Sequence, residues 1–166
     1  MSNSKTEIGP PRCRGLVFDG DALLMVRFNH PEDGDHWQIP GGGADPGETL
    51  GECLIRELRE ETGLIVEPGE LRYLSHVLAG NRVNPHMYFE AKAVGGNLQD
   101  LSAMTSEESE WFVERRFVNR SESLAIPSHP QHGVWDRVWD DRKRGFPEPV
   151  YLGAYTWTGE RLPQLR

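Results

Sequence analysis

The chain has 166 residues, and its 26 acidic and 18 basic side chains give it a formal net charge of −8. This balance disfavours a general nucleic-acid-binding protein, which would show a basic footprint. No stretch approaches the roughly 18 consecutive apolar residues of a membrane helix. The length suits one domain with a buried core. The charge leaves the question of where the acidic residues gather.

The N-terminus and the cysteines favour an intracellular protein. Residues 1–11 are polar, end in Pro10-Pro11 and lack the apolar segment of a secretory signal. We expect them to form a flexible tail ahead of a single domain over 12–166. Cys13 and Cys53 are too few for a disulfide framework and are expected to be reduced, partly buried thiols. The default location is therefore cytoplasmic.

The first part of the chain predicts a β-hairpin followed by glycine-rich connections. Apolar runs at 12–18 and 22–28 flank Asp19-Gly20, a pair that favours a tight hairpin turn. Glycine, proline and other turn-forming residues predict loops beyond it. The expected pieces are a loop over 29–35, a short extended segment over 37–39 and a loop over 41–47.

The second half predicts more strands and one further helix. Strands are expected over 71–78, 86–93 and 110–113, with a break over 127–130 and a last strand over 150–157. Residues 132–144 have the period of an amphipathic helix, and basic residues fill its last turn. Trp135 and Trp139 lie on the face of this helix that we expect to join the core.

The segment 49–62 is the clearest helix in the sequence. Thr49 and Glu52 form a capping box, with Thr49 as the N-cap. Gly63 fits the left-handed position at which helices end. Apolar residues recur every fourth position and define the face that packs on a core, namely Leu50, Leu54 and Leu58.

Glu57, Glu60 and Glu61 share an arc beside that apolar face, at positions i, i+3 and i+4. Carboxylates this close repel one another. On the helical wheel Arg56 and Arg59 lie elsewhere, so they are not expected to interleave with these acids. A bound divalent cation, Mg²⁺ above all, would resolve the repulsion. The alternative is an ordinary solvated helix face.

The wider pattern favours the cation. Five residues separate Gly42 from Glu48, and seven separate Glu48 from Arg56-Glu57-Leu58; Glu60-Glu61 and Gly63-Leu64 follow. This window resembles a complete Nudix box, the signature of the Nudix hydrolases, and the residues 37–42 (WQIPGG) resemble its usual entry. A match at every fixed position is far more specific than a lone glycine-rich motif.

The resemblance implies a fold and an activity. The fold is an α/β (α+β) Nudix-type αβα sandwich with a mixed β-sheet between helices. The activity is hydrolysis of a diphosphate bond in a nucleoside diphosphate linked to a group X, with Mg²⁺, or Mn²⁺ in its place. By position, the metal ligands would be Glu57, Glu60, Glu61 and the Gly41 carbonyl. Arg56 would hold Glu57 and Glu48 in place by charge-assisted hydrogen bonds.

The chemistry needs a base as well as a metal. Metals neutralise phosphate oxygens and lower the pKa of bound water, and a base must accept the proton of the attacking water. The resemblance offers Glu57 or a glutamate of a later loop. The loop candidates are Glu107, Glu108 and Glu110, with Glu108 and Glu107 preferred because Glu110 begins a predicted strand. The alternative for each is a solvated acid.

The substrate is less clear from the sequence. Some Nudix subfamilies carry a proline or a tyrosine at a fixed distance beyond the box, and here that distance falls near 80–82, where neither residue stands. A nucleoside di- or triphosphate is therefore the first choice. The alternative is that the enzyme carries out the same chemistry on ADP-ribose, a nucleotide sugar or a dinucleoside polyphosphate. A nucleotide sensor without turnover is disfavoured because every acid of the box is present.

Several aromatic and polar residues are candidates for substrate recognition, the alternative being ordinary surface residues. Arg82 could clamp a phosphate through both its guanidinium arms, and Asn81 could read a base edge. The full set is Phe28, Trp37, His76, Asn81, Arg82 and Asn84. The expected partner is thus a small nucleotide, with neither nucleic acid nor membrane involved, and the family makes a homodimer an option.

Overall fold

A computed structural model of the chain describes residues 5–32, 34–100, 102–129, 134–156 and 160–163. The helices in this part are α1 (Leu50–Thr62), α2 (Ser106–Trp111), α3 (Arg120–Ala125) and α4 (Val134–Lys143). The strands are β1 (Glu7–Ile8), β2 (Arg12–Leu16), β3 (Phe18–Asp19), β4 (Ala22–His30), β5 (Gly34–Gln38), β6 (Gly41–Gly43), β7 (Leu64–Ala79), β8 (Arg82–Gly96), β9 (Phe112–Asn119), β10 (Ser128–His129) and β11 (Val150–Thr156). None of these helices is long and apolar enough to cross a membrane.

The strands form two mixed sheets. One has the order β11-β7-β8-β2-β6, with β1 also paired to β8. In it, β8 is antiparallel to β7 but parallel to β2. The second sheet has the order β10-β5-β4-β3, with β9 paired to β4. The chain passes from the first sheet to the second between β2 and β3, so the turn at Asp19-Gly20 joins only β3 to β4.

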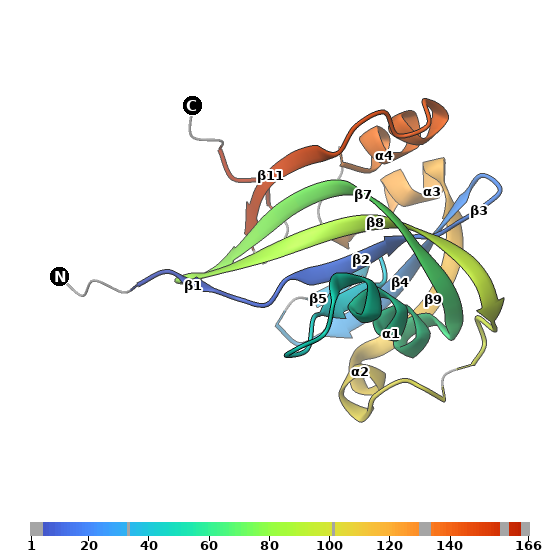
Figure 1. Cartoon of the computed structure of the whole chain (residues 1–166), viewed down its shortest axis with the longest axis horizontal. Coiled ribbons are helices and arrows are strands. Elements are labelled where there is room, and N and C mark those ends of the chain that lie inside the picture. The colour runs from blue at the N-terminus through green and yellow to red at the C-terminus, as the bar shows by residue number, and fades with distance from the viewer. Residues whose placement is uncertain (1–4, 33, 101, 130–133, 157–159, 164–166) are drawn as a thin grey trace.

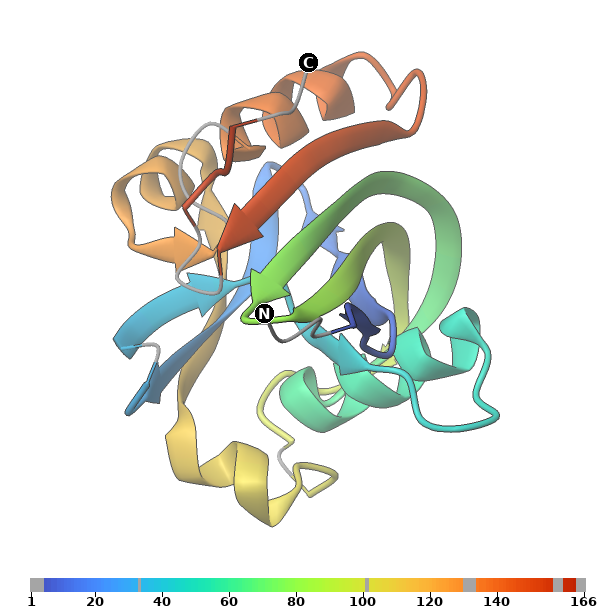
Figure 2. The same cartoon turned by 90° about the vertical axis from the view of Figure 1, so that its left-hand side faces the viewer.

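Helices cover the strands from two sides, with α1 on one side and α4 on the other (Figures 1 and 2). Leu54 and Leu58 of α1 pack with Val17 and Leu24 in one buried cluster. A second cluster includes the buried rings of Trp135 and Trp139 of α4, as the sequence predicts, together with residues of both sheets. The predicted α/β architecture is confirmed, and the strands between the helices form two mixed sheets where one was expected.

The clearest predicted helix is confirmed to its ends. The Thr49 side chain accepts a hydrogen bond from the Glu52 backbone N–H, and the Glu52 carboxylate accepts one from the Thr49 backbone N–H, so both halves of the capping box are present. Gly63 ends α1 in the left-handed conformation with φ +72°. These capping signals depend only on neighbouring residues, so they can be recognised from the sequence without knowledge of tertiary contacts.

Glycines 41–43 were expected in a loop, and this prediction is wrong. They form β6, which pairs antiparallel with β2. The predicted loop over 29–35 is also too long, since β4 continues to His30 and β5 starts at Gly34. In both cases the hydrogen-bonding partner strand overrides the turn propensity of individual residues.

Two other predicted boundaries differ from the structure. Residues 1–11 were expected to form a tail, but Glu7 and Ile8 within it form β1 and pair with the start of β8. The strand expected over 110–113 begins at Phe112 instead, because Glu110 lies in α2. Helix α3 was not predicted, although Asn119 and Glu122 form a capping box like that of α1.

The capping box of α1 gives a direct test of local stability. Thr49→Ala removes the hydroxyl that caps the Glu52 backbone, and we expect the free energy of unfolding to fall by about 1 kcal/mol. Thr49→Ser keeps the hydroxyl and should stay close to the unsubstituted protein. Urea unfolding followed by circular dichroism measures both variants. Equal loss in the two would contradict the capping role.

Candidate active site

The site is built where β6 passes against α1. Gly41 and Gly42 of β6 come so close to their neighbours that only glycine fits. Gly41 has φ +133°, and a Cβ on it would overlap the backbone of Cys13. A Cβ on Gly42 would overlap the Glu57 carboxylate. The glycines therefore let a strand lie directly on the acidic face of the helix.

Arg56 is the centre of the polar contacts. Its Nε and Nη2 donate to the two Glu48 carboxylate oxygens, each at 2.8 Å. Its Nη1 donates to Glu57 Oε1 at 2.9 Å and to Glu60 Oε2 at 3.1 Å. Nη2 also donates to the Gly43 carbonyl at 2.9 Å. One guanidinium thus ties the strand, the loop and the helix together, which agrees with the role that the Nudix resemblance gives it toward Glu48 and Glu57.

These contacts shift the acid–base properties of the residues involved. The Arg56 hydrogen bonds lower the pKa of the Glu48 carboxyl to about 2. The same bonds, led by those to Glu48, raise the pKa of Arg56 above its ordinary value. Both groups therefore remain charged across the physiological range.

The helical-wheel expectation that Arg56 lies away from the acids is wrong. The wheel places Arg56 on another arc, but its side chain is long enough to curve over the helix to Glu57 and Glu60. Position-based wheels describe Cβ directions, and a long flexible side chain can depart from them. The acidic arc is therefore partly neutralised within the protein.

Glu57 and Glu61 are buried and line a cavity, in contrast to Glu60. Their exposed fractions are 6% and 4%. The Gly41 N–H donates to Glu61 Oε2 at 2.6 Å, which fixes that carboxylate. Glu60 does not line this cavity, and its carboxylate accepts from Arg56. The three expected acidic ligands are therefore not equivalent: Glu57 and Glu61 line the cavity and Glu60 does not, although Glu57 and Glu60 both accept from Arg56.

This donor set fits Mg²⁺. Within the described residues, no three His, Cys, Asp or Glu side chains are arranged to hold a metal by themselves. Magnesium is usually held by only one or two carboxylates together with substrate phosphates and water. Glu57 and Glu61 supply two such carboxylates. The Gly41 carbonyl accepts from Arg14 Nη1 at 2.9 Å and, having a second lone pair, can also ligate.

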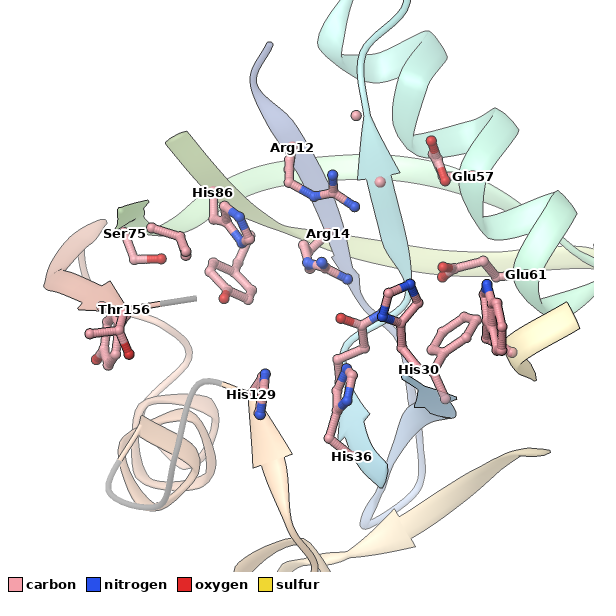
Figure 3. Close-up of a pocket in the computed structure, with 18 of the residues that line it drawn as sticks. Arg12, Arg14, His30, His36, Glu57, Glu61, Ser75, His86, His129 and Thr156 are labelled. Carbon is pink, nitrogen blue, oxygen red and sulfur yellow. The ribbon is translucent and has the colours of Figure 1, made fainter. Parts of the chain in front are cut away.

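The cavity has a volume of about 590 Å³ and joins the two sheets to α1 (Figure 3). In Figure 3, Glu57 and Glu61 lie on one wall, Arg12, Arg14 and His86 lie beside them, and Ser75 and Thr156 lie at the opposite end. Its remaining walls hold mostly aromatic and polar side chains with one aliphatic residue, namely Phe28, His30, His36, Gln38, Val77, Tyr88, Glu110, Trp111, His129 and Tyr155. This volume lies in the range of small-molecule sites.

The structure separates the candidate recognition residues. Phe28 lines the cavity. Trp37 does not, because its ring is 4% exposed within the core and lies 4.9 Å from the Arg116 guanidinium carbon. Asn81 and Arg82 lie at the β7–β8 turn, where the Asn81 amide donates to the Lys5 carbonyl. His76 contacts Tyr151, and Asn84 lies beside Gly9.

The three candidate bases that were expected on a later loop lie on helix α2 instead. Glu110, which was set aside as the start of a strand, is exposed on this helix and lines the cavity. The backbone of Glu107 and Glu108 lies on α2, and their side chains lie outside the described part of the structure. The helix runs beside β4, which carries Phe28.

Several lining residues were not singled out from the sequence. Arg12 and Arg14 alternate along β2, and His30, His36, His86 and His129 come from four different strands. The rings of His36 and His129 stack with centroids 4.2 Å apart. Two arginines at i and i+2 in an otherwise apolar run were the available signal, since they must share one face of a strand.

Comparison with known proteins agrees with this geometry. The NUDIX domain model matches residues 10–137. The chain belongs to the Nudix family. Among relatives, the RNA pyrophosphohydrolase of Erythrobacter litoralis is 31% identical over 135 residues, covering 78% of this chain and 76% of that protein. The 8-oxo-dGDP phosphatase NUDT18 of Mus musculus is 42% identical over 53 residues, 32% of this chain and 16% of its own length.

Solved structures show the same fold. A Nudix hydrolase from Nitrosomonas europaea superposes with a TM-score of 0.69 at 18% sequence identity, covering 90% of this chain and 80% of that one. This likeness is one of fold. The family match makes the chain a Nudix hydrolase, and enzymes of this family act on nucleotide substrates and typically use a divalent metal. The Nudix box is the strand–loop–helix unit that Arg56 ties together.

The depressed Glu48 pKa predicts how the stability of this Nudix hydrolase depends on pH. The Glu48–Arg56 pair stabilises the fold fully above about pH 4.5, the ordinary carboxyl pKa, and this stabilisation is lost as the pH falls toward 2. Glu48→Gln should lower the free energy of unfolding at pH 7, with the difference from the unsubstituted protein closing between pH 4.5 and 2. Chemical denaturation across this range measures it, with exposed Glu148→Gln as the control. A difference independent of pH would contradict the pairing.

The close approach of Gly42 predicts a specific loss of activity. Gly42→Ala forces its new methyl group against the Glu57 carboxylate. We expect hydrolysis to fall by about 10²-fold, the effect of displacing a catalytic group by about 1 Å. Gly51→Ala on α1 is the matched control, since its nearest neighbour would be Pro68 Cγ at 3.9 Å. Phosphate release and melting temperature are measured for both, and equal activities would show that Glu57 tolerates the shift.

Proposed function

We propose that this Nudix hydrolase cleaves the diphosphate bond of a nucleoside di- or triphosphate with Mg²⁺, or with Mn²⁺ in its place. The observation that carries the proposal is the pair of buried carboxylates, Glu57 and Glu61, on one wall of a cavity that also holds two arginines. Acids alone would repel a diphosphate, so their burial beside cations fits a site that binds metal and phosphate together.

The residues divide the work of hydrolysis. Glu57, Glu61 and the Gly41 carbonyl would hold the metal, and Glu60 would complete the set when its carboxylate turns from Arg56. A bound Mg²⁺ supplies charge neutralisation at the phosphate oxygens and lowers the pKa of a nearby water. Arg56 and Glu48 position Glu57, because their hydrogen bonds fix the helix against β6. Positioning of this kind dominates catalysis of phosphoryl-type transfer.

Proton removal falls to a glutamate on one of two elements. Glu57 on α1 is one candidate, and the α2 acids Glu107, Glu108 and Glu110 are the other. Glu110 lines the cavity, which supports a contribution from α2. Single Gln substitutions at the four positions distinguish them, since the true base should lose the acidic limb of the pH–rate profile.

A second candidate substrate is the triphosphorylated 5′ end of RNA. The name of the Erythrobacter litoralis relative, an RNA pyrophosphohydrolase, favours it. The chemistry at the diphosphate is the same for both substrates. The RNA substrate differs from a small nucleotide because its polynucleotide chain would extend out of the cavity. This option departs from the expectation that no nucleic acid is involved.

A substrate panel tests the proposal. The protein is incubated with Mg²⁺ and nucleoside di- and triphosphates, an oxidised guanine nucleotide, ADP-ribose, a nucleotide sugar, a dinucleoside polyphosphate and a 5′-triphosphorylated RNA. Products are identified by mass. We expect the highest kcat/KM with a small nucleotide. Turnover confined to the RNA would transfer the assignment to it, and no turnover of any compound would refute the proposal.

The two buried carboxylates give the sharpest mutational prediction. Glu57→Gln and Glu61→Gln should each reduce kcat/KM by more than about 10²-fold, since even an outer-shell partner of a metal typically costs 10–100-fold. Glu148→Gln, an exposed acid outside the cavity, should leave the rate unchanged. Circular dichroism confirms the fold of each variant. Turnover retained by both Glu57→Gln and Glu61→Gln would exclude α1 as the catalytic helix.

A further inference from the structure

A row of residues crosses the large sheet beside the carboxylates. Arg12 of β2 pairs in register with His86 of β8, and His86 pairs with Ser75 of β7. On its other side Arg12 pairs with Gly43 of β6. Residues in register across neighbouring strands share a face. Arg14 lies two residues further along β2, so its side chain joins the same face.

This row opens into the cavity with two nitrogen atoms that have no hydrogen-bond partner among the described residues. Arg12 Nε and His86 Nε2 are both buried and make no hydrogen bond in the described structure. His86 as a whole is only 8% exposed. Buried polar atoms are nearly always hydrogen-bonded. Figure 3 shows the Arg12, Arg14 and His86 side chains pointing into the same space, between Glu57 and Ser75.

The cluster is also positively charged. Burial, and then the neighbouring Arg14, lower the pKa of Arg12. Burial, followed by Arg14 and Arg12, lowers the pKa of His86 to about 2, so its imidazole is neutral at physiological pH. The two adjacent guanidiniums disfavour further cations, and the neutral imidazole can donate through the ring nitrogen that carries its proton. They favour an oxyanion that can accept several hydrogen bonds at once.

One of the arginines is fixed and the other is available. Arg14 Nη1 donates to the carbonyls of Ile39 at 2.7 Å and Gly41 at 2.9 Å, which anchors its charge beside the box. Arg12 Nε makes no hydrogen bond in the described structure, and the Arg12 side chain lines the cavity. A tetrahedral phosphoryl group offers an oxygen to each of these side chains.

We propose that Arg12, Arg14 and His86 form a second phosphoryl-binding subsite, separate from the carboxylates, which holds a phosphate group of the substrate or of the pyrophosphate product. The ligand class rests on the proposed function. The subsite orients the phosphate chain along β2, with its reacting end at Glu57 and Glu61 and the organic group toward Ser75, Tyr155 and Thr156. A chain that reaches both positions needs at least two phosphates.

Binding without metal tests the subsite apart from turnover. Pyrophosphate is titrated into the whole protein in EDTA by calorimetry, with Arg12→Gln, His86→Phe and the control Lys92→Gln, an exposed basic residue of β8 outside the cavity. Loss of one charge-assisted contact should weaken pyrophosphate binding by about tenfold in the first two variants and leave the control within about twofold. Absent binding in the unsubstituted protein, or equal affinity in all four, would overturn the proposal.

A second measurement, on the unsubstituted protein, tests the role of His86 even if His86→Phe does not fold. The ¹⁵N resonance of His86 Nε2 should shift when pyrophosphate is added in EDTA, and an unchanged resonance would also overturn the proposal. Turnover then separates the two sources of phosphate. A substrate role predicts that Arg12→Gln raises KM, and a product role predicts weaker inhibition by pyrophosphate with KM unchanged. Failure of the substrate panel with metal-free binding intact would refute the hydrolysis and leave the subsite standing.

Discussion

The structure of this site depends on how one guanidinium compensates several carboxylates. Glu57 and Glu61 are buried on consecutive turns of one helix, where their charges repel and desolvation is unfavourable. Arg56 answers this by donating to Glu48, Glu57 and Glu60. The Gly41 backbone N–H does the same for Glu61. Without these donors, the acids that would bind metal could not be held inside the protein.

The same constraint explains the glycine strand. For Arg56 to reach the Gly43 carbonyl, β6 must lie directly on α1, and a side chain at Gly42 would occupy the position of the Glu57 carboxylate. Pairing of β6 with β2 then brings Arg12 and Arg14 alongside the acids. The negative and positive walls of the cavity are thus set by one strand pairing, and a diphosphate with its metal meets both.

The sequence predicts those parts of the molecule whose causes are local. Both ends of helix α1 are predicted correctly because each is set by residues within one turn, Thr49 with Glu52 at the start and Gly63 at the end. The Nudix box also names the acids, because their spacing is that of one helix. Helix α3 could have been found from Asn119 and Glu122 by the same reasoning. The placement of β6 could not, because glycine propensity favours a loop and only the partner strand β2 reverses it.

The remaining site residues depend on contacts between distant segments. Arg12 and His86 become neighbours through the register of β2 with β8, which no local pattern specifies. Trp37 adjoins the box in sequence, yet strand alternation turns its ring into the core and under Arg116. Arg56 was placed away from the acids by the helical wheel, since a wheel omits the reach of a long side chain. The hydrogen bonds of Arg56 to the surrounding carboxylates therefore follow from the fold and not from the helical pattern.

A double-mutant cycle between Arg56 and Glu48 tests this central claim most directly. The free energy of unfolding at pH 7 is measured for Arg56→Gln, for Glu48→Gln and for the double variant. The bidentate, half-buried pair predicts a coupling energy of about 0.5–3 kcal/mol, the range for residues in one hydrogen-bond network. A coupling energy near zero would contradict the account, because it would mean that the guanidinium does not hold the loop, the strand and the helix as one unit.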